Sequence, residues 1–569
     1  MVIDARHVPT GETIETEVCV IGGGPAGITL ATQFVGQGFR VSLLETGGLE
    51  PDAAIQSMAQ GNNEGDAYPG AIHMRTRQFG GTAHQWGIWM QNNDPQGDRG
   101  VRYVTLDPID FEKRDWVPNS GWPFGKETLD PYYERAHAFC ETGPYNYDVA
   151  YWETEQAKAL KFSDRLSNRM FQFGRRDIFL HDYRQKIEQS NNVSLYLYAT
   201  VTELESDDLA QTVTRVRVAT LAGNQFWVAA KIVILAMGTI ENARLLLLSD
   251  KANKQGLGNQ NDVVGRYYMD HPLVRSGMMV PPNRQVINSL SFYDAHWVKG
   301  TKVIAKPVLS EAVMRREKLL NMNAALFPRP SIYQYNPLRM LFPKGKHYHS
   351  KTTAAGRAFK QAIRDKKLPK DLLRHTGNLI TGMDDLMFFQ WRSKQRLTHP
   401  YGLDTGGWSE LADKEKRFGC YEVFHITDQA PDPTNRIVLN DNRDRLGNRQ
   451  VKIHWRWNEI DIRSTRRAQE IFAEEFAQAG LGKLNLELDH GVPQVFLPST
   501  HHNIGSTRMH NDPKQGVVDA NCQVHGVSNL FVASSSVFPT GGYANPTLTI
   551  VAIAIRVADE VKARITGQK

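Results

Sequence analysis

A glycine-rich segment near the start of the chain, TEVCVIGGGPAGITLATQFVGQGFRVSLLE (residues 16–45), constrains the fold more than any other stretch. A short apolar run predicts a buried strand, the next stretch has helical periodicity, and FRVSLLE predicts a second strand. Gly22, Gly24 and Gly27 match G-x-G-x-x-G. The acidic residue Glu45 follows at the spacing of a dinucleotide-binding βαβ unit. The segment therefore predicts a parallel α/β domain that binds a dinucleotide.

The residues of this motif have distinct expected roles. Gly22 allows a tight turn, Gly24 lets a pyrophosphate approach the backbone, and Gly27 lets helix and strand pack closely. Pro25 suits the first helical turn, where free N–H groups favour phosphate. Glu45 is expected to bind a ribose diol, which disfavours NADP. The motif does not separate FAD from NAD. A glycine-rich turn without a ligand is disfavoured because all four parts of the unit agree.

The composition is typical of a globular protein, and it excludes several classes. The 569 residues are 41% hydrophobic and 22% charged, enough apolar material for a large core. No apolar run is long enough to predict a transmembrane segment, and the polar N-terminal stretch lacks the apolar core of a secretory signal. Four cysteines lie far apart in sequence, so no metal site is expected and a cytoplasmic, reducing compartment is favoured.

The net charge of +6 comes from one stretch of the chain. Lys and Arg greatly outnumber Asp and Glu between Arg339 and Arg396. No nucleic-acid-binding motif accompanies this stretch, so we expect no nucleic-acid partner. Three interpretations stay open: a solvated face, a lid over a substrate pocket, or a docking surface for an acidic partner, an electron-transfer subunit or an anionic membrane.

The pattern along the chain predicts two lobes. A second buried strand begins SNLFVASSSVFPT (528–540), and ligands of parallel α/β folds bind beyond the carboxyl ends of such strands. The strands that end near Ile21 and Val532 are thus expected to open onto one crevice. We predict an α/β fold: a Rossmann-like FAD-binding domain with an inserted α+β substrate-binding domain built on an antiparallel sheet. The expected divisions are residues 1–270, then 271–460 with the basic insert 339–396, then 461–569, which completes the first domain and the active site.

Several blocks together resemble one family, the glucose–methanol–choline (GMC) oxidoreductases, which are FAD enzymes. The blocks are CVIGGGPAGITLA, FGGTAHQWG, ILAMGTIENARLLL, VGRYYMDHP, GVVDANCQVHGVSNLFVASSSVFPT and ANPTLTIVAIAIRVADEV. Within the family, HNIGSTRM and FPTGGYANPTLTI are most similar to the branch of pyranose oxidases and glucoside 3-dehydrogenase-like enzymes. The middle lobe carries the resemblance only by its position.

The resemblance implies two catalytic residues. His502 begins the family's H-x-x-G motif with Gly505, whereas His501 is out of register. Asn545 stands where the family has His or Asn. The FAD-binding residues that it implies are Gly22, Gly24, Pro25, Ala26, Gly27, Glu45, Gly81, Thr82, Gln85, Val201, Ala236, Pro546 and Thr547.

Two positions depart from the family. Pyranose oxidases carry a histidine, covalently linked to the flavin, where this chain has Gln85, and His84 is one residue out of register. We therefore expect non-covalent FAD. Many relatives have an acidic residue where this chain has Ser534, so a flavin contact there is not carried over.

The implied chemistry is alcohol oxidation. Flavin N5 accepts a hydride, and an unprotonated His502 takes the hydroxyl proton. Asn545 binds the same oxygen, although Asn545 before Pro546 is also an ordinary helix cap. The expected reaction converts a secondary hydroxyl of a sugar or glycoside, at position 3 or 2 of a pyranose, to a ketone. The alternatives are another alcohol or polyol, a flavin-containing lyase, or a non-catalytic FAD-bound protein. The electron acceptor, whether oxygen, a quinone or a partner protein, stays open.

Overall fold

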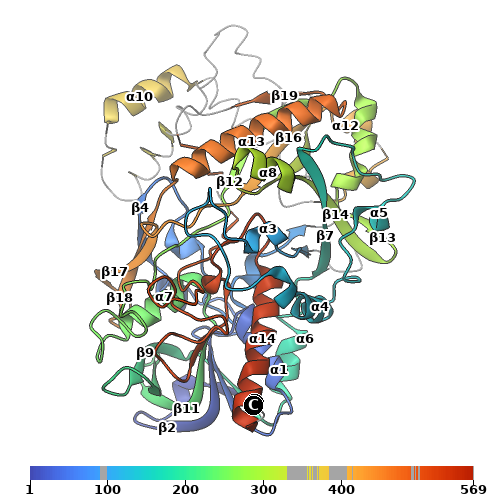
Figure 1. Cartoon of the computed structure of the whole chain (residues 1–569). Helices are drawn as coiled ribbons and strands as arrows, with labels where there is room; N and C mark the ends of the chain where they lie inside the picture. The colour runs from blue at the N-terminus through green and yellow to red at the C-terminus, as the bar shows by residue number, and fades with distance from the viewer. Residues whose placement is uncertain are drawn as a thin grey trace.

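The computed structural model describes residues 1–89, 99–329, 406–412, 414–487 and 500–567, with short stretches between 355 and 383 and between 492 and 496. Figure 1 shows two lobes, one above the other. The lower lobe holds strands β2, β9 and β11 and the long helix α14 (Thr547–Thr566). The upper lobe holds a second sheet, beneath helix α13 (Glu459–Gln478). No helix of the described residues is both long and apolar enough to cross a membrane.

The sheet of the lower lobe has eight strands in the order β1-β8-β3-β2-β11-β10-β9, with β20 paired to β11. Strands β1, β8, β3, β2, β11 and β20 pair in parallel, and β9 and β10 extend the sheet as antiparallel strands. The strands are β1 (Val2–Asp4), β2 (Thr13–Ile21), β3 (Val41–Leu44), β8 (Val193–Leu197), β9 (Thr200–Ser206), β10 (Val213–Ala219), β11 (Gln225–Leu235) and β20 (Leu530–Val532).

The carboxyl ends of three parallel strands meet at one edge of this sheet. Leu235 at the end of β11 pairs with Ile21 of β2 and with Val532 of β20. The segments that follow these strands begin side by side, although hundreds of residues separate them in sequence. This is the shared crevice expected from the two strand ends.

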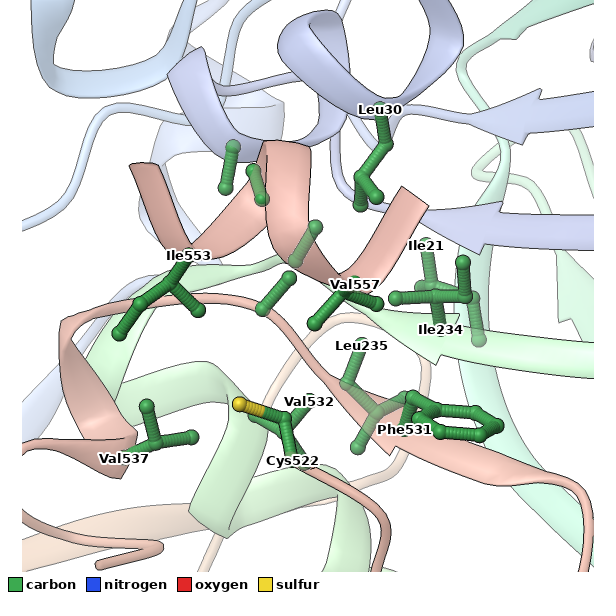
Figure 2. Packing of buried hydrophobic residues seen from close by; sticks show 14 of the residues in the cluster. Ile21, Leu30, Ile234, Leu235, Cys522, Phe531, Val532, Val537, Ile553 and Val557 are labelled. Carbon is green, nitrogen blue, oxygen red and sulfur yellow. The ribbon is translucent and has the colours of Figure 1, made fainter. Parts of the chain in front are cut away.

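Helix α14 is buried between the sheet and helix α1 (Pro25–Phe34). Figure 2 shows α14 between Leu30 of α1 on one side and Leu235 and Val532 of the strands on the other. Ile553 is fully buried in this cluster. The mostly apolar sequence of α14 is explained by these two apolar neighbours, because both of its faces exclude water.

The sheet of the upper lobe has nine strands, and all its pairs are antiparallel. Its order is β19-β12-β16-β15-β14-β7-β6-β5, with β13 paired to β14. One face packs against α13, where His425 of β16 contacts Phe472. The strands are β5 (Ile88–Trp89), β6 (Arg99–Tyr103), β7 (Leu166–Arg175), β12 (Leu273–Val280), β13 (His296–Val298), β14 (Thr301–Leu309), β15 (Met322–Arg329), β16 (Cys420–Thr427) and β19 (Lys483–Leu486).

The fold class is the one predicted, but the strand pairing crosses the expected divisions at residues 270 and 460. Strands β5, β6, β7 and β19 and helix α13 all belong to the upper lobe, yet lie outside residues 271–460. Strands β17 (Arg436–Arg443) and β18 (Arg449–Trp455) pair instead with β4 (Gly61–Gly65) in a three-stranded sheet. These pairings join segments far apart in sequence, so local periodicity does not reveal them.

Shorter helices connect the sheets. They are α2 (Ala53–Ser57), α3 (Pro108–Phe111), α4 (Asp130–Phe139), α5 (Val149–Trp152), α6 (Asp182–Glu188), α7 (Gly238–Leu248), α8 (Glu311–Glu317), α10 (Leu372–Thr381) and α12 (Lys414–Arg417). Most of the basic stretch 339–396 lies outside the described residues. Its three interpretations therefore stay predictions.

Candidate active site

One pocket lies at the carboxyl ends of the parallel strands, with about 1410 Å³ of empty space. Twelve of the predicted site residues line it, and they come from segments spread over the whole chain. These are Gly22, Gly24, Pro25, Ala26, Glu45, Gly81, Thr82, Val201, Ala236, His502, Pro546 and Thr547. Gly27, Gln85 and Asn545 are not among the lining residues.

The three glycines of the first loop have different surroundings. Gly22 has φ 109°, and its N–H donates to the Leu44 carbonyl at 2.8 Å, which fits the tight turn after β2. A Cβ on Gly27 would lie 1.8 Å from the carbonyl oxygen of Gly22, so this position packs helix against strand. A Cβ on Gly24 would meet no atom within 4 Å. Because Gly24 lines the pocket, that free space is available to a ligand.

Glu45 lies at the end of β3 and is 6% exposed. Its carboxylate accepts hydrogen bonds from the N–H groups of Gly23 and Gly47, each at 2.7 Å. Burial raises the pKa of Glu45, and the two backbone donors oppose that rise. Each carboxylate oxygen has a second lone pair, so Glu45 can still accept a hydroxyl from the pocket.

The sequence analysis missed a cluster of charged residues on the pocket wall. Arg77 and Arg75 both pair with Glu241, the former at 2.8 Å, and Arg244 pairs with Asp444 at 2.7 Å. The three arginines lower the pKa of Glu241, although burial alone would raise it. The Nε atom of Arg77 is buried without a hydrogen-bond partner. The signal was present as the RTR triplet just before the FGG block.

These residues fit a dinucleotide with a negatively charged diphosphate. The free space above Gly24 leads to the N-terminus of α1, whose N–H groups favour anions. The unpartnered Nε of Arg77 adds a donor on the same pocket, and Glu45 offers an acceptor. Donors for phosphate and an acceptor for ribose are the polar groups that FAD requires.

The FGG block forms a 3-10 helix, Gly81–Gln85, against the first glycine loop. The N–H of Gly80 donates to the carbonyl of Gly23 at 2.7 Å. Gly81 and Thr82 therefore face the pocket, whereas the Gln85 amide donates to the hydroxyl of Thr76 at 2.7 Å. The ring of His84 contacts the Phe79 carbonyl at 2.8 Å.

His502 and Asn545 lie together, as the resemblance implied. The Nδ2 of Asn545 lies 3.2 Å from Nε2 of His502, and Nδ1 of His271 lies 3.3 Å from Nδ1 of His502. If the amide donates to Nε2, the proton of His502 is on Nδ1 and points to His271. His271 was missed by the sequence analysis, although it lies in the quoted block VGRYYMDHP.

The surroundings favour the neutral form of His502. Burial is the main cause that lowers its pKa well below the ordinary value, and positive charges around it act in the same direction. Burial also lowers the pKa of His271 to about 3. Both imidazole rings are therefore neutral near neutral pH, so Nε2 of His502 can accept a proton.

A hydrogen-bonded group holds the backbone around His502. Asp270 accepts from the Asn503 amide at 3.1 Å and from the hydroxyl of Tyr68. His501 has φ 56°, an unusual conformation for a residue other than glycine. This conformation turns the chain between His501 and His502, both of which line the pocket.

The alternative role of Asn545 as a helix cap is not the one observed. Helix α14 has Pro546 at its N-cap position and no side-chain cap hydrogen bond. The Asn545 amide instead contacts His502, while its Oδ1 is buried without a partner. Pro546 and Thr547 bring the positive end of the helix to the pocket wall. Ser534 also lines the pocket and accepts from the Asn242 amide at 3.0 Å.

Comparison with known proteins supports this description. Residues 431–554 match the family model for GMC oxidoreductases. The fructose dehydrogenase large subunit of Gluconobacter japonicus is 25% identical over 59% of this chain and 47% of its own length. A 2-methyl-1,2-propanediol dehydrogenase of Mycolicibacterium austroafricanum is 26% identical over 61% of this chain and 50% of its own length. The chain thus spans about half the length of these relatives.

One further relative matches over a shorter stretch of the chain, and one solved structure matches over nearly the whole chain at lower identity. A C-glycoside 3-oxidase of Arthrobacter globiformis is 34% identical over 22% of this chain and 23% of its own. The structure of an Aspergillus oryzae formate oxidase aligns over 99% of this chain and all of its own, with a TM-score of 0.51 and 15% identity. That identity shows the fold alone.

The fold and the pocket define a class, the α/β proteins with a dinucleotide-binding loop and a second, antiparallel lobe. Within that class the chain is similar to the GMC oxidoreductases, whose family model matches residues 431–554.

Proposed function

We propose that this protein oxidises a secondary hydroxyl of a sugar or glycoside to a ketone, at position 3 or 2 of a pyranose ring. One observation carries the proposal: His502 lines the pocket that the dinucleotide loop also lines, and Asn545 is in contact with His502. Relatives named as a fructose dehydrogenase and a C-glycoside 3-oxidase support a sugar as the substrate class.

The residues divide the work of alcohol oxidation between them. His502 accepts the hydroxyl proton at Nε2, because burial keeps the imidazole neutral. Asn545 holds the same oxygen with its amide and fixes the carbon in position. His271 fixes the orientation of His502 through Nδ1. When bound, FAD would supply the acceptor for the hydride.

The FAD would be held without a covalent bond. Gln85 occupies the position of the flavin-linking histidine in pyranose oxidases, and its amide cannot form that link. Gly24, Glu45 and Arg77 would bind the dinucleotide portion, while the N-terminus of α14 would stabilise negative charge at the ring. Precipitation with acid should release the yellow chromophore, and a pellet that keeps it would contradict this part of the proposal.

The deciding experiment is anaerobic flavin reduction with a panel of monosaccharides, glycosides and polyols. We expect a pyranose to bleach the flavin, and His502→Ala to lower the reduction rate by about 10³-fold or more with the chromophore still bound. His7→Ala, at an exposed histidine, is the matched control and should leave the rate unchanged. Turnover without bleaching would indicate a lyase, and equal rates in His502→Ala would indicate a non-catalytic role for this residue.

The second candidate is another alcohol, such as a diol or polyol, oxidised by the same residues. The 26% identity to a 2-methyl-1,2-propanediol dehydrogenase favours it. Bleaching by polyols and not by any pyranose in the same panel would select it. The same reduced sample is then mixed with oxygen or with a quinone, and the compound that reoxidises the flavin identifies the class of electron acceptor.

A further inference from the structure

Two cations inside the upper sheet form no ion pair with a carboxylate of the described residues. They are Arg102 on β6 and Lys306 on β14. Lys306 is 2% exposed, and its Nζ has no hydrogen-bond partner. Burial lowers the pKa of Arg102 to about 10. Burial also lowers the pKa of Lys306 well below its ordinary value, and the charge of Arg102 adds to that effect. Burial without a partner favours the uncharged form of the Lys306 amine, and a nearby anion would favour its charged form.

Other buried cations of the same sheet are paired. Arg169 pairs with Asp107 at 3.3 Å, and Arg329 pairs with Glu422 at 3.0 Å. No carboxylate of the described residues forms an ion pair with Arg102 or Lys306. Charges inside proteins are usually paired, as Arg169 and Arg329 are.

Strand register places both cations on the sheet face toward the candidate catalytic residues. Lys306 pairs with Arg169, and Arg102 pairs with Phe173 on the same strand, β7. Phe171 lies between Arg169 and Phe173 on that face, because side chains alternate along a strand. Phe171 packs in the core shared with the lower lobe, whereas the preceding residue, Met170, points to the other face and packs in the core beneath α13.

Contacts then connect Lys306 with the candidate active site. Nζ of Lys306 lies 4.9 Å from the centre of the Phe171 ring. That ring lies 6.3 Å from the ring of Tyr543, two residues before Asn545. Burial is the main cause of the lowered pKa of His502, and the positive charges of Arg102 and Lys306 act in the same direction.

Arg102 and Lys306 also line one small cavity. Its remaining wall is mostly apolar, with Ile304, Phe327 and Trp408. The one carboxylate among its lining residues is Asp294. Asp294 already accepts from the N–H groups of Gly407 at 3.0 Å and Ser409 at 2.8 Å. A cavity with two free cations and an occupied carboxylate is suited to an external anion.

We infer that Arg102 and Lys306 bind a carboxylate of the substrate, which makes the substrate a sugar acid such as a uronic acid or its glycoside. This inference rests on the proposed function, because it concerns the molecule that His502 and Asn545 act on. The substrate carboxylate would be the negatively charged partner that Arg102 and Lys306 lack among the described residues. A neutral sugar leaves them unpaired.

The test compares two substrates that differ only at carbon 6, methyl glucoside and methyl glucuronide. In anaerobic flavin reduction the glucuronide should have a ratio of rate to dissociation constant about ten- to hundred-fold higher. Lys306→Met, which keeps the length of the side chain and removes its charge, should abolish that advantage. Lys299→Met, in the exposed turn before β14, is the matched control and should preserve it.

Two further measurements separate a binding role from a structural one. Without ligand, Lys306→Met should keep or raise the melting temperature, because it removes a buried polar group that has no hydrogen-bond partner. A lower melting temperature together with an equal loss for both substrates would overturn the inference. So would equal reduction by the two substrates in the unaltered protein, which leaves the proposed function intact.

Calorimetry decides the case in which neither substrate bleaches the flavin and the proposed function fails. Binding of methyl glucuronide to the FAD-loaded protein, lost in Lys306→Met and kept in Lys299→Met, would still support the anion site. Absence of glucuronide binding to the unaltered protein would overturn it.

Discussion

A Cβ on Gly24 would meet no atom within 4 Å, so the packing of the fold does not require a glycine at this position. We expect Gly24→Ala to weaken FAD binding by about ten-fold or more, which corresponds to about 1.4 kcal/mol. The melting temperature of the FAD-free protein should not change. Flavin fluorescence titration measures the affinity. Gly38→Ala, an exposed glycine of the same βαβ unit that also meets no atom, is the control. Equal affinity in both variants would contradict the prediction.

Under the proposed function, the pKa of His502 sets the pH dependence of the reaction. A base acts when it is unprotonated, and burial moves the protonation of His502 to more acidic pH. The rate of flavin reduction should therefore stay constant between about pH 6 and 8, where an imidazole of ordinary pKa loses activity on the acidic side. Stopped-flow reduction across this range measures it. A half-maximal rate near the ordinary histidine pKa would show that His502 is more exposed to water in the working enzyme.

Helix α14 links the stability of the lower lobe to the pocket. Ile553 is fully buried between the sheet and α1, so Ile553→Ala should lower the free energy of unfolding by about 2–5 kcal/mol. Ile565, near the end of the same helix, is only partly buried, and Ile565→Ala should cost less. Urea unfolding measures both. An equal loss of stability in the two variants would contradict the burial of α14 between the sheet and α1.

Strand β16 carries a histidine that makes the upper lobe sensitive to acid. Both ring nitrogens of His425 are hydrogen-bonded, to the Asn323 carbonyl at 3.0 Å and to the Ser276 hydroxyl at 2.7 Å. Burial lowers its pKa to about 4. The unfolded chain therefore takes up the proton first as the pH falls below about 6.5, and stability decreases until about pH 4.

We expect His425→Gln to reduce this loss of stability between about pH 6.5 and 4. Urea unfolding at several pH values, followed by tryptophan fluorescence, gives the slope. The exposed variant His7→Ala should keep the slope of the unaltered protein. The same slope in His425→Gln would assign the acid sensitivity to another group.

At the scale of the whole molecule, the sequence predicted structural units formed by neighbouring residues and missed pairings between segments far apart in the chain. The β2-α1-β3 unit follows from the spacing of Gly22, Gly24 and Gly27, since each glycine acts within a few residues of itself. The meeting of His502 and Asn545 followed from resemblance and not from periodicity. Strand β7 pairs with β14, more than a hundred residues later. Nothing in local periodicity specifies that partner, so the divisions at 270 and 460 cut across the sheet.

The same limit explains the missed site residues. Arg77 and His271 are isolated in sequence from the groups that they contact, Glu241 and His502. Their roles appear only when the lobes are assembled. An inventory of the cations and histidines inside the family blocks and directly beside them is the sequence signal that could have found both residues.

The late position of β20 has a consequence for how the protein is made. Val532 joins the sheet beside Leu235, and the helix that buries the sheet's apolar face comes after it. During translation most of the polypeptide thus leaves the ribosome before β20 can pair with β11 and before α14 can cover the apolar face of the sheet. Neither that edge of β11 nor that face can be covered until β20 and α14 have emerged. The pocket, which Ser534 and Thr547 help to line, is therefore complete only after both segments have joined the lower lobe.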